Sequence, residues 1–76
     1  MMEFTLNNEK DVENALAYLD SEERIIAEIN SDVLGYCVVD LFYEPHRDIY
    51  TIFDKCDIEF TDINELEDYI IRYYHL

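Results

Sequence analysis

The sequence predicts an α+β fold in which a small antiparallel β-sheet of three to four strands packs against two amphipathic helices. Two segments carry apolar residues at helical spacing, and the stretches between them are rich in Val, Ile, Tyr and Phe. A chain of 76 residues suffices for one domain, so we expect residues 1–76 to form a single compact acidic unit. Half of the residues are hydrophobic, which allows a buried core in spite of a formal net charge of −14.

The beginning of the chain predicts a strand followed by a helix. Phe4 and Leu6 alternate with polar residues over residues 3–6, which indicates a strand. The Asn7–Asn8 pair offers a helix N-cap, and we expect an amphipathic helix over residues 9–20. Its apolar positions are Val12, Ala15, Leu16 and Leu19.

Residues 21–30 are compatible with two structures. Ser21 can cap a second helical segment, whereas the three isoleucines within residues 24–29 favour a strand. We favour the strand, because the polar residues 30–32 that follow it are typical of a turn.

The middle of the chain predicts a β-hairpin. Residues 35–43 form the most apolar strand, and residues 49–53 form its partner after a polar loop over residues 44–48 that contains the single proline. A second polar turn over residues 54–57 precedes a short apolar segment over residues 58–60.

The last segment predicts a second amphipathic helix. Asp62 and Glu65 have the spacing of a capping box, with Asp in place of the usual Ser or Thr. The expected buried stripe consists of Ile63, Leu66, Ile70 and Tyr73, with Tyr69 at its margin. The positions expected off this stripe are Glu65, Glu67, Asp68 and Tyr74.

Composition restricts the compartment and the type of partner. No apolar run is long enough to cross a membrane, and the N-terminus lacks the basic and apolar regions of a signal peptide. Cys37 and Cys56 are too few for a disulfide framework. We therefore expect a cytoplasmic protein. Phosphates and anionic lipids repel a negatively charged protein, so we also expect that it binds neither nucleic acid nor membrane directly.

No motif predicts catalysis, a cofactor or a metal site. The acidic segment of residues 54–62 does not fit a calcium-binding loop, because its third and fifth positions are Cys56 and Ile58 and its sixth is not glycine. The two cysteines and two histidines lack the close pairs of structural zinc sites. Nothing resembles a nucleophile elbow, and the single Gly35 cannot build a phosphate-binding loop. We therefore expect a protein that is not an enzyme.

The carboxylates and tyrosines predict a binding surface instead. Residues three or four apart on a helix, or two apart on a strand, lie about 5–7 Å from each other, which is close to the phosphate spacing of a nucleic-acid strand. Only five Lys and Arg oppose 19 Asp and Glu, and tyrosine is enriched at interfaces. The expected partner-binding residues are Asp20, Glu22, Glu23, Asp54, Asp57, Glu59, Glu65, Glu67, Asp68, Tyr69 and Tyr74.

In size and charge the chain looks like the phage-type acidic inhibitors: DNA-mimic, anti-CRISPR and anti-restriction proteins. The expected partner is a basic protein, such as a nucleic-acid-binding protein or a nuclease complex, whose binding surface the acidic domain occludes. One alternative is an immunity protein or antitoxin that neutralises a basic toxin such as a nuclease. The other is a regulatory or structural subunit whose acidity keeps it soluble. The sequence leaves a homodimer open.

Overall fold

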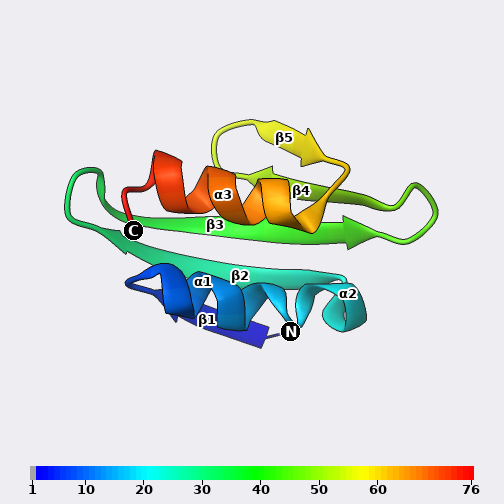
Figure 1. Ribbon diagram of the computed structural model, residues 1–76, viewed down its shortest axis with the longest axis horizontal. Coiled ribbons are helices and arrows are strands. Elements are labelled where there is room, and N and C mark those ends of the chain that lie inside the picture. Colours follow the sequence, from blue (N-terminus) through cyan, green and yellow to red (C-terminus); the bar gives the residue numbers. More distant parts are fainter. Residues whose placement is uncertain (1) are drawn as a thin grey trace.

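The computed structural model describes residues 2–76, which form one five-stranded sheet and three helices (Figure 1). The predicted α+β class is therefore confirmed. The strands lie in the order β1-β2-β3-β4-β5. The elements are β1 (Met2–Leu6), α1 (Glu9–Leu16), α2 (Leu19–Glu22), β2 (Arg24–Ser31), β3 (Gly35–Glu44), β4 (Ile49–Phe53), β5 (Asp57–Phe60) and α3 (Ile63–Tyr73).

The sheet is mixed, and in this respect the prediction of three to four antiparallel strands is wrong. β1 and β2 are parallel, with Phe4 beside Ala27, whereas the other neighbouring strands are antiparallel. A parallel pair needs a long crossover connection. α1 and α2 supply it, because they return the chain to the end of the sheet at which β1 begins, so that β2 can run in the same direction. The fifth strand arises because the segment after the second polar turn pairs with β4.

The single helix predicted over residues 9–20 is divided into α1 and α2. The amide of Tyr18 donates to the carbonyl of Ala15 at 3.1 Å, only three residues back, so the helix tightens and ends near Leu16. The second segment ends at Glu23, whose φ of 62° is left-handed and turns the chain into β2.

The predicted helix starts are confirmed. The side chain of Asn8 accepts a hydrogen bond from the amide of Asp11 at 3.0 Å, and Asp11 in turn accepts one from the amide of Asn7 at 2.8 Å. At α3 the Asp62 side chain accepts from the amide of Asn64 at 2.9 Å. Both helices thus begin at a residue that satisfies a free backbone donor.

The ambiguous residues 21–30 form the last residues of α2 and most of β2, so the favoured strand is confirmed. Ile25, Ala27 and Ile29 are buried, while the residues between them point to the other side of the sheet. The hairpin of β3 and β4 is also confirmed, with Tyr43 opposite Tyr50.

The helices all lie on one side of the sheet. In Figure 1, α1 runs along β1 and β2, and α3 runs along β3, β4 and β5. The core lies between the two layers and combines alternate strand residues with the apolar faces of the helices. Its buried members are Leu6, Val12, Ala15, Leu16, Leu19, Ile25, Ala27, Ile29, Val39, Leu41, Tyr50, Ile52, Leu66, Ile70 and Tyr74.

The end of α3 differs from the predicted stripe. Tyr74 is 1% exposed, whereas Tyr73 is 50% exposed, so the expectation that Tyr73 is buried and Tyr74 lies outside the stripe is wrong. Both residues follow Ile70 at a spacing that suits the buried stripe. The Tyr74 hydroxyl donates to Asp54 in the turn between β4 and β5 at 3.0 Å, and this partner favours Tyr74 as the buried residue.

Candidate functional site

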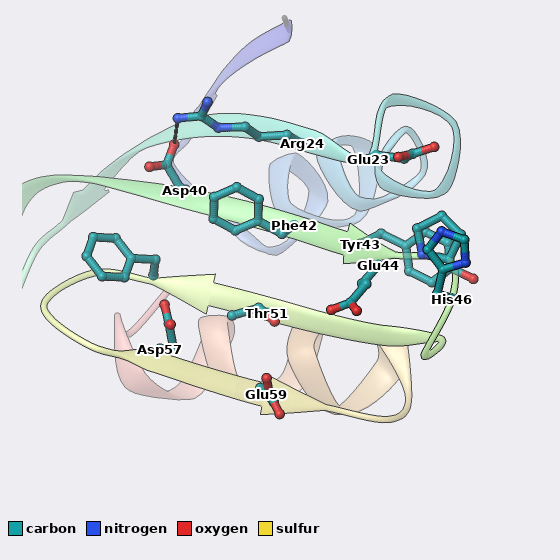
Figure 2. A pocket seen from close by; sticks show the side chains of 12 residues that line it. Glu23, Arg24, Asp40, Phe42, Tyr43, Glu44, His46, Thr51, Asp57 and Glu59 are labelled. Carbon is teal, nitrogen blue, oxygen red and sulfur yellow. Dashed lines mark hydrogen bonds and ion pairs between the residues drawn. The ribbon is translucent and has the colours of Figure 1, made fainter.

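The side of the sheet opposite the helices is an uncovered surface, which we call the open face. Alternation along each strand places every second side chain there, and within residues 2–76 no helix packs against it (Figure 2). Its residues are Glu3, Thr5, Arg24, Ile26, Glu28, Asn30, Tyr36, Val38, Asp40, Phe42, Glu44, Ile49, Thr51, Phe53, Asp57 and Glu59.

Four apolar side chains lie around Asp40 in the middle of the open face. The register places Ile26 and Phe53 on the two sides of Asp40, while Val38 and Phe42 are its neighbours along β3. Val38 is 50% exposed and Phe53 is 43% exposed. All four are cross-strand or same-strand neighbours of Asp40 on one sheet face, so they gather in one region of that face, which we call the apolar centre. Such a patch on an otherwise charged surface is typical of an interaction site.

An ion pair lies within the apolar centre. The Arg24 guanidinium is 3.2 Å from the Asp40 carboxylate, and its central carbon is 5.4 Å from the centre of the Phe42 ring. The two charged side chains are 45% and 27% exposed. A pair this open to water contributes about 0–1 kcal/mol, so it places two opposite charges in the patch without strongly stabilising the fold.

Carboxylates lie next to the apolar centre on the side toward β5. Figure 2 shows a hollow that crosses the open face from Arg24 on β2 to Asp57 and Glu59 on β5. Its lining residues are Glu23, Arg24, Asp40, Phe42, Tyr43, Glu44, Pro45, His46, Thr51, Phe53, Asp57 and Glu59.

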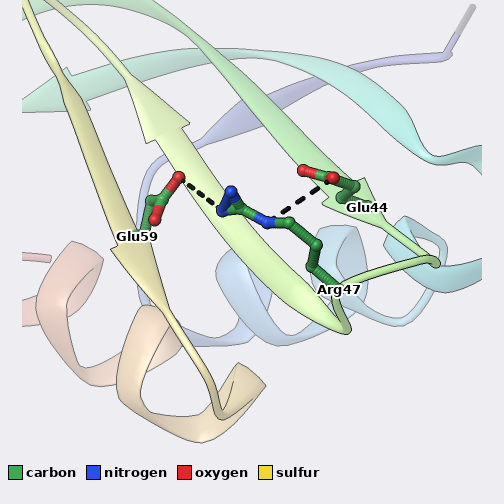
Figure 3. Close-up of polar contacts among 3 residues, drawn as sticks. All are labelled: Glu44, Arg47 and Glu59. Atoms are coloured by element: carbon green, nitrogen blue, oxygen red, sulfur yellow. Dashed lines mark hydrogen bonds and ion pairs between the residues drawn. The ribbon is translucent and has the colours of Figure 1, made fainter.

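Arg47 bridges two carboxylates at the edge of this hollow. Its guanidinium is 2.9 Å from Glu59 and 3.5 Å from Glu44, which joins the end of β3 to β5 (Figure 3). The hollow thus has five lining carboxylates and two arginines in contact with them, so it carries three uncompensated negative charges. Among residues 2–76, no cation pairs with Asp57 or Glu23.

Two of the predicted partner-binding carboxylates instead bind tyrosine hydroxyls. The Tyr50 hydroxyl donates to Asp20 at 2.9 Å, and the Tyr74 hydroxyl donates to Asp54 at 3.0 Å. Burial, followed by the hydrogen bond to Asp20, raises the pKa of Tyr50 to about 12. Burial and the bond to Asp54 raise the pKa of Tyr74 in the same way. These contacts join α2 and α3 to the sheet and give Asp20, Asp54 and Tyr74 structural roles.

The structure divides the remaining predicted residues between two sides of the molecule. Asp57 and Glu59 lie on the open face, and Glu23 lines the hollow from the end of α2, beside Glu22 in sequence.

The residues predicted on α3 belong to the helical layer. Asp68 pairs with Arg72 at 3.0 Å, and the Tyr69 ring lies between Phe60 and Tyr73 at centroid distances of 5.5 and 5.3 Å. Glu65 and Glu67 lie on the same helix. These residues are therefore not part of the open face, and the eleven predicted residues do not form one site.

The sequence analysis missed the apolar centre and the Arg24–Asp40 pair. One signal pointed to them, because residues 35–43 have apolar side chains at both even and odd positions. A strand of this kind has apolar side chains on both faces, and helices on one side of the sheet cover only one of them.

Residues 2–76 can also be compared with the requirements of thiol chemistry, metal binding and membrane crossing. Cys37 and Cys56 are free thiols, and burial raises the pKa of Cys37. Residues 2–76 contain no group of three or more His, Cys, Asp or Glu placed to hold a metal ion. They also include no helix long and apolar enough to cross a membrane.

Comparison with known proteins finds no matching family model, no similar curated protein and no similar solved structure.

Proposed function

We propose that this protein is a non-catalytic inhibitor that binds the basic, nucleic-acid-handling surface of a partner protein through its open face. The observation that carries the proposal is the apolar centre of Ile26, Val38, Phe42 and Phe53 with carboxylates around it. Affinity in protein interfaces comes mainly from a desolvated centre that contains aromatic side chains, while the polar rim selects the partner.

Charge complementarity determines which partner fits. The hollow beside the apolar centre carries three uncompensated negative charges, and the whole chain carries −14. A partner surface rich in Arg and Lys is attracted to it, which accelerates association. Nucleic acid and anionic lipid carry the wrong sign. A second copy of this chain would oppose one acidic rim to another, so we do not propose a homodimer through this face.

A second candidate function is immunity protein or antitoxin for a basic toxin. The exposed Val38 and Phe53 favour it, because a pure phosphate mimic needs no apolar side chains between its carboxylates. An apolar centre instead needs a complementary apolar patch on one specific partner. Both candidates use the same face and the same electrostatics.

Charge reversal on two faces tests the proposal. Asp57→Lys with Glu59→Lys alters the rim of the open face, and Glu67→Lys with Asp68→Lys alters α3. The two double variants are matched, because each changes the net charge equally and each removes one carboxylate that pairs with an arginine. Immobilised wild-type and variant proteins capture partners from a lysate of the source cells, and the captured protein is identified and purified.

The proposal expects a basic protein whose affinity falls by about tenfold or more with the open-face variant and is unchanged with the α3 variant. Its affinity should also fall steeply with salt, and nucleic acid should compete for it. A small basic toxin would identify the second candidate. Equal effects of the two variants, or a partner indifferent to nucleic acid and to salt, would overturn the proposal.

A further inference from the structure

We infer that Phe53 and Asp57 form a subsite for an arginine side chain of the partner. The inference rests on the proposed function, because it names the group that the open face recognises. Its basis is that two pairs of neighbouring Phe and Asp side chains lie on the open face. One pair, two residues apart on β3, already holds a guanidinium of this chain, and the other is opposed across β4 and β5.

The occupied arrangement consists of Phe42, Asp40 and Arg24. Arg24 and Phe42 are directly opposed on β2 and β3, and the guanidinium lies above the ring at 5.4 Å while it contacts the carboxylate at 3.2 Å. The planar guanidinium suits both partners, since its face stacks on the ring and its edge donates to the carboxylate. On the open face, one guanidinium thus contacts a phenylalanine ring and an aspartate at the same time.

The second arrangement consists of Phe53 and Asp57. These residues are directly opposed on β4 and β5, so their side chains are neighbours on the open face. Phe53 is 43% exposed and Asp57 is exposed, and both line the hollow. Figure 2 shows Asp57 on β5 at this place. No cation of residues 2–76 pairs with Asp57 or lies over the Phe53 ring.

The surrounding charges favour a cation that comes from outside. Arg24 remains with Asp40, and Arg47 remains with Glu44 and Glu59, so neither neutralises Asp57. An incoming guanidinium therefore gains a carboxylate without displacing an existing pair. A lysine ammonium has the same charge but is compact and strongly hydrated, so it stacks less well on an aromatic ring.

Peptide titration tests this subsite without the natural partner. Nitrogen-15-labelled protein is titrated with the capped pentapeptide Gly-Gly-Arg-Gly-Gly and with its lysine counterpart, and amide chemical shifts report affinity and location. We expect the arginine peptide to shift amides of β4 and β5 near Phe53 and Asp57. It should bind about threefold or more tightly than the lysine peptide.

Three variants separate the contributions. Phe53→Leu keeps an apolar side chain but should abolish the preference for arginine, and Asp57→Asn should weaken both peptides. Glu67→Gln on α3 is the matched charge control, and it should leave the affinities of both peptides unchanged. All three positions are at least partly exposed, so dispersed amide spectra should show that the folds are intact.

Equal affinities for the two peptides, shifts confined to α3, or an arginine preference that persists in Phe53→Leu would overturn the subsite. These outcomes differ from failure of the proposed function. If the Asp57→Lys, Glu59→Lys variant loses the partner but the peptides bind equally, the function stands and the subsite is wrong. If arginine is preferred but charge reversal leaves partner capture unchanged, the subsite stands and the proposed partner contact is wrong.

Discussion

The hydrogen bond from Tyr74 to Asp54 should make a measurable contribution to the stability of the fold. Tyr74→Phe removes the hydroxyl and leaves the ring packed in the core, where Tyr74 is 1% exposed. A hydrogen bond to a charged group contributes about 1.5–3 kcal/mol, and water can partly replace it at the half-buried Asp54. We therefore expect a loss of about 1–2 kcal/mol, which lowers the Tm of a domain this size by roughly 4–16 °C.

Tyr36→Phe is the matched control, because the Tyr36 hydroxyl also donates to a carboxylate, Glu28, but Tyr36 is 62% exposed. Its loss should cost less than about 0.5 kcal/mol. Urea and thermal unfolding followed by circular dichroism measure both variants, together with Asp54→Asn and the Tyr74→Phe, Asp54→Asn double variant. The pair should be coupled by about 1 kcal/mol. The structural role assigned to Tyr74 is refuted if its variant costs no more than the control, or if the effects of the pair simply add.

Three further outcomes are expected. In the folded protein Tyr50 has a pKa of about 12, so it keeps its proton until the pH approaches that value. In the unfolded chain it releases the proton near its ordinary pKa of about 10. Stability should therefore fall as pH rises from about 10 to about 12, and Tyr50→Phe should flatten that fall in unfolding curves; an unchanged slope contradicts the assignment. Leu66→Ala should destabilise the fold by about 2–5 kcal/mol through a core cavity, in contrast to Glu65→Ala on the exposed side of α3. Raising NaCl from about 0.01 to about 0.1 M should raise the Tm, because the Debye length falls from about 30 to about 10 Å and screens the repulsion of a −14 chain; a falling Tm would show that ion pairs dominate.

Local patterns were sufficient for most of the individual elements. The N-caps Asn8 and Asp62, the strand that contains Ile25, and the β3–β4 hairpin all depend on residues close together in the sequence. Apolar periodicity also identified the buried residues of α1 correctly. These features form from short-range hydrogen bonds and from the spacing of side chains along one element, which the sequence displays directly.

Contacts between distant segments decided the rest. The parallel pairing of β1 with β2 depends on where the α1–α2 crossover returns the chain. The choice of Tyr74 over Tyr73 depends on Asp54, which is 20 residues away.

The candidate site is of the same kind. The charge of the chain followed from composition, but the open face did not. Alternation in β3 shows which residues share a face, yet both of its faces are apolar, so the pattern does not say which one the helices cover. The neighbours Phe53 and Asp57 depend on the register of β4 with β5. The sequence by itself determined an acidic α+β domain, and only the packing of its two layers decided which apolar and acidic residues lie on the open face, because that choice depends on contacts between segments that are not adjacent in the chain.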